Sequence, residues 1–144
     1  MIRVAAAVLA VTLLATGCAD QQEKYCDAVG DHQAELGELL GDGSPDALLK
    51  ALPVLRDLAD EAPDDIRDEW RTVIDAVEGL QQALDDAGVD PEDFDGGKPP
   101  KGLSKEERQA IAQAADQVGS RTTEVALAGV QQQALDVCKT QLWL

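Results

Sequence analysis

The sequence predicts an all-α protein, a compact helical bundle of four to five helices closed by one disulfide. Ala, Leu, Asp, Glu and Gln dominate the 144 residues, whereas aromatic residues make up only 3%. Apolar residues recur three, four and seven positions apart, which is helical spacing, and no stretch alternates for long enough to indicate a sheet. A chain of this length suits one domain with a modest core.

Residues 1–17 predict a signal peptide. Arg3 gives a positive start, residues 4–14 are apolar except for Thr12, and the small residues 15–17 follow. As a helix, this apolar run would span about 17 Å, whereas a hydrocarbon core is about 30 Å thick. We therefore expect an exported protein whose mature chain has no transmembrane helix.

Cys18 follows the signal peptide directly and predicts a lipid anchor. The residues LATGC, from Leu14 to Cys18, resemble the lipobox of bacterial lipoproteins. In that family the cysteine sulfur receives a diacylglycerol, the chain is cut just before it, and the new amino group can also be acylated. An ordinary cleavage site using Ala15 and Gly17 is the alternative. Lipidation is favoured because it leaves a pair of thiols instead of an odd number.

The anchor would place the protein at the cell membrane, on its extracytoplasmic face. Residues 18–24 would form a short membrane-proximal tether, and residues 25–144 the helical domain. Loss of Arg3 with the signal peptide changes the formal charge from −16 to −17. Such a surface repels nucleic-acid phosphates. The expected partners are thus the membrane, through the lipid, and an envelope protein, but no nucleic acid; no cofactor is expected beyond the lipid.

The first two helices are predicted from stripes of apolar residues and from helix-capping residues. The first runs from about Asp20 to Leu40. The second begins with Ser44 as N-cap and Pro45 as its first helical residue, and Pro53 is expected to kink it. Its apolar stripe consists of Leu48, Leu49, Leu52, Leu55 and Leu58.

The third helix, residues 64–87, has the most regular stripe in the chain, and Gly88 is expected to end it. Residues 89–102 form a loop, because three prolines and three glycines occur there. The stripe of the third helix consists of Ile66, Trp70, Val73, Ile74, Val77, Leu80 and Leu84.

The C-terminal part of the chain predicts two helices. Ser104 and Glu107 form a capping box. An unbroken helix to Gln141 would be about 57 Å long, too long for a compact bundle. We therefore expect a break at Gly119–Ser120. The residues expected to face inward are Ile111, Ala115, Val118, Val125, Val130, Ala134 and Val137.

Two cysteines remain if Cys18 carries lipid, and they predict a disulfide between Cys26 and Cys138. Thiols of exported proteins oxidise, and closing a loop of this length stabilises the fold by nearly 5 kcal/mol in the chain-entropy model. The alternative is a metal or redox site that includes His32. A single histidine cannot build the usual multi-histidine shells, so a structural role for His32 is favoured.

Catalytic chemistry is not indicated, and we expect the protein not to be an enzyme. His32 is the only imidazole, and the serines at 44 and 104 are explained as helix caps. An acidic loop offers weak oxygen ligands for calcium, but its order does not match an EF-hand, so no dedicated metal site is expected. These weak candidates are Asp90, Glu92, Asp93 and Asp95.

The segments YCDAV, LADEAPDDIRDEW and QQQALDVCKTQLWL, together with the lipobox, resemble small lipoproteins of actinobacteria. Those proteins pair an early Tyr-Cys with a late Val-Cys across a helical domain. They have no assigned activity, so the resemblance implies fold and location only.

These observations predict a noncatalytic binding or accessory protein of the cell envelope. The alternative is a lipoprotein that binds a small ligand or calcium. An apolar patch near Trp70 or Trp143 would support a binding role, although the C-terminal segment around Trp143 is expected to dock on the bundle.

Overall fold

The structure is a computed structural model that describes residues 16–41, 43–44, 46–95 and 98–143, with side chains from residue 20 onward. Its five α-helices are α1 (Thr16–Gly41), α2 (Ala47–Glu61), α3 (Arg67–Ala87), α4 (Lys105–Val118) and α5 (Arg121–Gln133). A 3₁₀ helix, η1 (Pro91–Asp93), follows α3, and a π-helical segment, η2 (Ala134–Cys138), continues α5. The described residues form no strand, apart from one isolated bridge. The all-α prediction is confirmed.

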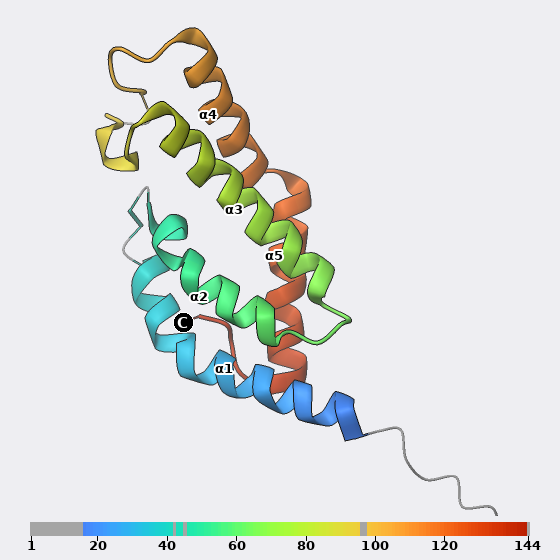
Figure 1. The fold of residues 1–144 in the computed structure, drawn as a ribbon. Helices are drawn as coiled ribbons and strands as arrows, with labels where there is room; N and C mark the ends of the chain where they lie inside the picture. The colour runs from blue at the N-terminus through green and yellow to red at the C-terminus, as the bar shows by residue number, and fades with distance from the viewer. Residues whose placement is uncertain (1–15, 42, 45, 96–97, 144) are drawn as a thin grey trace, which may run out of the picture.

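The helix α3 is the centre of the bundle (Figure 1). It contacts α2, α4 and α5, while α1 packs on α2 and on η2. Figure 1 shows α1 and α2 as an antiparallel pair, with α4 beside the C-terminal part of α3 and α5 beside its N-terminal part. The start of α1 and the connection between α3 and α4 therefore lie at opposite ends of the molecule.

The core is built around Tyr25 of α1 and Trp70 of α3. Neither side chain is exposed, and the Trp70 indole N–H donates a hydrogen bond to the Tyr25 hydroxyl at 3.2 Å. Burial raises the pKa of Tyr25 above its ordinary value, although the hydrogen bond from Trp70 acts in the opposite direction. The other fully or nearly fully buried large side chains are Leu36, Leu52, Leu55, Leu58, Leu142, Val29, Val77 and Val130.

A disulfide joins Cys26 of α1 to Cys138 at the end of η2, with the two Cα atoms 5.0 Å apart. The predicted pairing is therefore confirmed. Lys139 then adopts a left-handed backbone conformation with φ of 58°, and the chain turns back over the bundle. Leu142 is buried there, and the Gln33 side-chain amide donates to the Gln141 carbonyl at 2.8 Å. The C-terminal segment docks on the bundle, as expected.

Three predicted helix starts differ from the structure. The first helix, expected from about Asp20, begins at Thr16, and the starts of α2 and α3 are wrong by two to three residues. The N-cap of α2 is Asp46, not Ser44, because the Ala47 N–H donates to the Ser44 carbonyl in a turn. The Asp46 carboxylate lies 2.7 Å from the Lys50 ammonium, and hydrogen bonds from Lys50 and Ser44 lower its pKa. Pro45, the expected first helical residue, lies outside the described residues.

The third helix begins at Arg67 instead of residue 64, because Ile66 donates its N–H to the Pro63 carbonyl in a turn that buries the Ile66 side chain. Its end is as predicted: Gly88 has φ of 64°, a left-handed conformation that glycine adopts without a steric penalty. Pro53 lies inside α2 with its side chain exposed.

The predicted break between α4 and α5 is confirmed. Gly119 ends α4, and the Ser120 hydroxyl accepts a hydrogen bond from the Thr123 N–H at 3.3 Å. The inward face was predicted less well, since Val125 is 59% exposed and Ala115 is exposed. Ile111, Val130 and Ala134 are buried as predicted, but on α5 the buried residue is Ala126 and not Val125. The buried residues of α5 and of the first position of η2 are Thr123, Ala126, Val130 and Ala134.

We predict that loss of the Cys26–Cys138 bond lowers the free energy of unfolding by about 2–5 kcal/mol. The bond restrains two residues that are 112 positions apart, so its removal gives the unfolded chain many more conformations. Urea unfolding of the oxidised chain, the reduced chain and the Cys26→Ala/Cys138→Ala variant measures the effect. The Cys18→Ala variant keeps the bond and serves as control. Equal midpoints for the oxidised and reduced chains would contradict the prediction.

We predict that Tyr25→Phe destabilises the protein by about 1–3 kcal/mol at neutral pH, because the buried Trp70 N–H then has no acceptor. The free energy of unfolding, measured in urea, tests this.

The pH dependence provides a second readout of the same variant. The pKa of Tyr25 is raised in the folded chain. The protonated phenol therefore contributes fully to the free energy of unfolding below pH ~10, and this contribution is lost as the pH rises through the pKa of the folded state. The wild-type chain should therefore lose more stability above pH ~10 than Tyr25→Phe does. Tyr25 is the only tyrosine, so no second phenol contributes. Identical alkaline profiles would sink this account.

Candidate functional site

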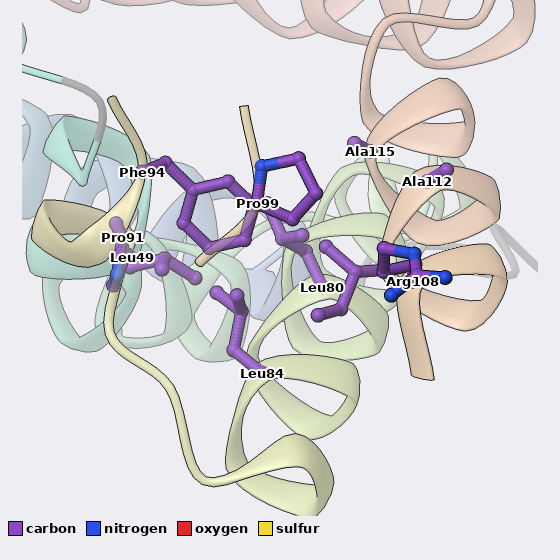
Figure 2. A pocket seen from close by; sticks show the side chains of 10 residues that line it. Leu49, Leu80, Leu84, Pro91, Phe94, Pro99, Arg108, Ala112 and Ala115 are labelled. Atoms are coloured by element: carbon purple, nitrogen blue, oxygen red, sulfur yellow. The ribbon is translucent and has the colours of Figure 1, made fainter. Parts of the chain in front are cut away.

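An open groove with apolar walls lies between α3, α4 and the connection that joins them. Its volume is about 350 Å³. In Figure 2, Leu80 and Leu84 of α3 form its floor, Phe94 and Pro91 lie on one side, and Arg108 of α4 lies on the other. We call it the apolar groove. It is lined by Leu49, Leu80, Leu84, Pro91, Phe94, Pro99, Arg108, Ile111, Ala112 and Ala115.

The groove exists because α4 covers α3 incompletely. Ile111 is the only buried residue among those of α4, and Leu49 and Leu80 are each only half-buried. The helix α2 begins near the C-terminal part of α3, so Leu49 from its first turn reaches the same place. Apolar side chains from distant parts of the chain are thus brought together without being fully covered.

The connection between α3 and α4 has a definite shape. The Asp90 N–H donates to the Asp93 carboxylate at 2.9 Å, and the Asp90 side chain accepts from the Asp93 N–H. This capping box begins η1 at Pro91. Asp95 and Lys98 then exchange two backbone hydrogen bonds of 3.2 and 3.1 Å. These local bonds hold Phe94, which lies between them in the sequence, against the groove.

One charged side chain, that of Arg108, lines the groove. Its Nη1 donates to the Leu103 carbonyl. The neighbouring Glu107 carboxylate accepts the Ser104 N–H at 2.6 Å, and this backbone hydrogen bond lowers the pKa of Glu107. The predicted capping box of α4 is confirmed, and it engages the carboxylate next to Arg108.

The four acidic residues considered as weak candidates for metal ligands make other contacts or lie in other elements. Asp90 and Asp93 bind each other's backbone in the capping box, Glu92 lies in η1, and Asp95 lies in the bridge with Lys98. Among residues 20–143, leaving out the undescribed positions, no three His, Cys, Asp or Glu side chains are grouped to hold a metal.

His32 is half-buried on α1, and its Nδ1 lies 3.2 Å from the Glu35 carboxylate on the same helix. The two cysteines proposed as alternative partners of His32 are joined to each other instead. The backbone of Cys18 lies in α1, while its side chain falls outside the described part, so its lipidation stays a prediction. No helix in the described part of the chain has the length and apolarity to cross a bilayer.

The groove was not located from the sequence, which pointed to Trp70 or Trp143 as markers of a binding patch. Trp70 is fully buried, and Trp143 packs partly against the core. Phe94 was the available signal, because it is the only phenylalanine and lies in an otherwise polar and Pro/Gly-rich loop. Its partners in the groove come from α2, α3 and α4, and only folding brings them together.

Comparison of the chain with protein-family models, with curated proteins and with solved structures finds no match. The resemblance to small actinobacterial lipoproteins therefore stays a prediction. The function has to be inferred from the geometry of the apolar groove and from the N-terminal sequence.

Proposed function

We propose that the protein is an exported, lipid-anchored and noncatalytic binding protein of the cell envelope, and that the apolar groove is its binding site. The groove carries the binding role, and the N-terminal sequence up to Cys18 carries the export and the lipid anchor. Partly covered apolar side chains from four parts of the chain line a volume of about 350 Å³, which is within the range of small-ligand sites. Contiguous exposed apolar surface of this kind marks binding sites in soluble domains.

The chemistry of the lining supports a noncatalytic role. Of the lining residues, only Arg108 has a polar side chain. An arginine stays protonated at physiological pH and cannot act as a general base. The lining side chains therefore supply neither a nucleophile nor an acid–base pair.

The placement of the groove suits an anchored protein. With lipid on Cys18, the membrane would lie at the start of α1, whereas the groove lies at the connection between α3 and α4. These two places are at opposite ends of the molecule (Figure 1). After cleavage before Cys18, 24 of the 26 residues of α1 would remain, from Cys18 to Gly41. They form a helix about 36 Å long, so the groove would face away from the bilayer.

We predict that Cys18→Ala moves the protein from the membrane fraction to the soluble exported fraction, because two or more acyl chains are needed for stable anchoring. Fractionation and mass spectrometry of the mature chain measure this. Cys26→Ala should stay lipidated and membrane-bound. An unmodified Cys18 in the wild-type mature chain would disprove the anchor.

We predict that Ala112→Trp blocks the groove. Ala112 is exposed on the groove side of α4, so a large side chain would occupy the ligand volume without disturbing the core. Forcing extra volume into a filled site costs about 1–3 kcal/mol, and binding of an apolar fluorescent dye should weaken about tenfold or more. Fluorescence titration measures the affinity.

Ala110→Trp is the matched control, since Ala110 is exposed on the same helix but does not line the groove. It should bind the dye as the wild-type chain does, and both variants should unfold at the same temperature. Equal dye binding by Ala112→Trp and Ala110→Trp would place the binding site elsewhere.

A further inference from the structure

The segment beside the apolar groove has an unusual charge for this protein. The whole chain has 12 basic and 28 acidic residues, yet residues 98–108 contain four basic and two acidic ones. Three of the basic residues occur at positions 98–105 with no acidic residue between them. The basic residues of this segment are Lys98, Lys101, Lys105 and Arg108.

These cations differ from most of the basic residues on α2 and α3. Arg56, Arg67 and Arg71 each have a carboxylate partner within 4 Å. In contrast, Lys98, Lys101 and Lys105 are exposed and form no ion pair with any residue that the structure describes. We call Lys98, Lys101 and Lys105 the basic rim. An anion near the basic rim would meet ammonium groups that have no ion-pair partner among the described residues.

Arg108 connects this rim to the groove. Its hydrogen bond to the Leu103 carbonyl uses one of the five N–H donors of a guanidinium. The remaining donors have the fork geometry that matches a carboxylate. Because Arg108 also lines the groove, a carboxylate bound to it would lie at the edge of the apolar walls.

The body of the groove fits hydrocarbon. Apart from Arg108, its lining side chains have no polar atoms, and Pro91 and Pro99 have no backbone N–H to donate. A peptide in this place would bury amide groups with few partners, at a cost of a few kcal/mol for each unpaired group. A volume of about 350 Å³ is at the lower end of ligand sites. This volume favours a ligand with one hydrocarbon chain over a ligand with several.

We infer that the apolar groove binds a single-chain fatty acid, with the hydrocarbon chain between α3, α4 and Phe94 and the carboxylate at Arg108. This inference rests on the proposed function, because it names the ligand class of the same groove. The acidic remainder of the protein repels a free carboxylate and leaves the basic rim as the favoured approach.

Isothermal titration of three ligands with the same chain length tests the inference. The ligands are dodecanoate and dodecyltrimethylammonium, each below its micellar concentration, and dodecanol, below its solubility limit. The protein is the whole exported chain with Cys18→Ala, so that no attached lipid competes. Arg108 is exposed, and an exposed ion pair contributes at most about 1 kcal/mol. Dodecanoate should therefore bind about fivefold more tightly than dodecanol, and the cationic ligand should bind more weakly than both.

Arg108→Gln should weaken dodecanoate binding about fivefold and leave dodecanol binding unchanged. Arg108→Lys should keep part of the preference, because it retains the charge. Arg121→Gln is the matched control: Arg121 is exposed at the start of α5, does not line the groove, and its loss gives the same charge change. Thermal unfolding of each variant shows whether it is folded.

The outcomes separate the two proposals. If Ala112→Trp abolishes the binding of neither dodecanoate nor dodecanol, the groove does not bind lipid chains and the fatty-acid inference is wrong. Binding of an apolar peptide in the groove would then still support the proposed binding function. If both bind equally and Arg108→Gln changes neither affinity, the groove binds apolar ligands but the carboxylate inference is wrong. Equal losses of dodecanoate affinity in Arg108→Gln and Arg121→Gln would show that only the net charge of the protein matters. This outcome would also overturn the carboxylate inference.

Discussion

The bond between Cys26 and Cys138 holds the first helix against the end of the last one, and the core is packed beside it. Tyr25 is the preceding residue, and its hydroxyl accepts the N–H of Trp70, so α1, α3 and η2 meet at one place. Leu142 returns over this core after the disulfide. A small domain with 3% aromatic residues has little apolar area to bury, and a covalent restraint on the unfolded chain compensates for it.

The groove is a consequence of where this core lies. The helix α5 and the C-terminal half of α2 pack on the N-terminal part of α3 (Figure 1), while α1 packs on α2 and on η2. With 21 residues, α3 is about 32 Å long, whereas α2, with 15 residues, is about 23 Å long. The C-terminal part of α3 is thus left mainly to α4, which buries only Ile111, and to the connection that carries Phe94. Leu80 stays half-buried as a result.

Charge contributes little to the folding of this protein. The ion pairs, such as Arg56 with Glu78 across α2 and α3, are largely exposed, and exposed pairs contribute at most about 1 kcal/mol each. A formal charge of −16 opposes compactness through self-repulsion but also keeps copies of the chain apart. Against this background, residues 98–108 have four basic and two acidic side chains beside the apolar groove, whereas the preceding residues 90–95 of the connection are acidic. The proposed fatty-acid site depends on that combination of features.

The sequence alone determined the order of the helices, the break at Gly119–Ser120 and the disulfide. Gly88 and the Ser104–Glu107 capping box act through backbone hydrogen bonds within a few residues. The Cys26–Cys138 pairing followed from the cysteine count once Cys18 was assigned to the lipid anchor. Only the tertiary structure decided which side of α5 is buried, and it left Val125 exposed. It also decided the groove, because Phe94 and its apolar neighbours come from four separate parts of the chain. Local hydrogen bonds depend on adjacent residues and can be predicted from the sequence. Burial depends on which segments, distant in the sequence, pack together in the fold.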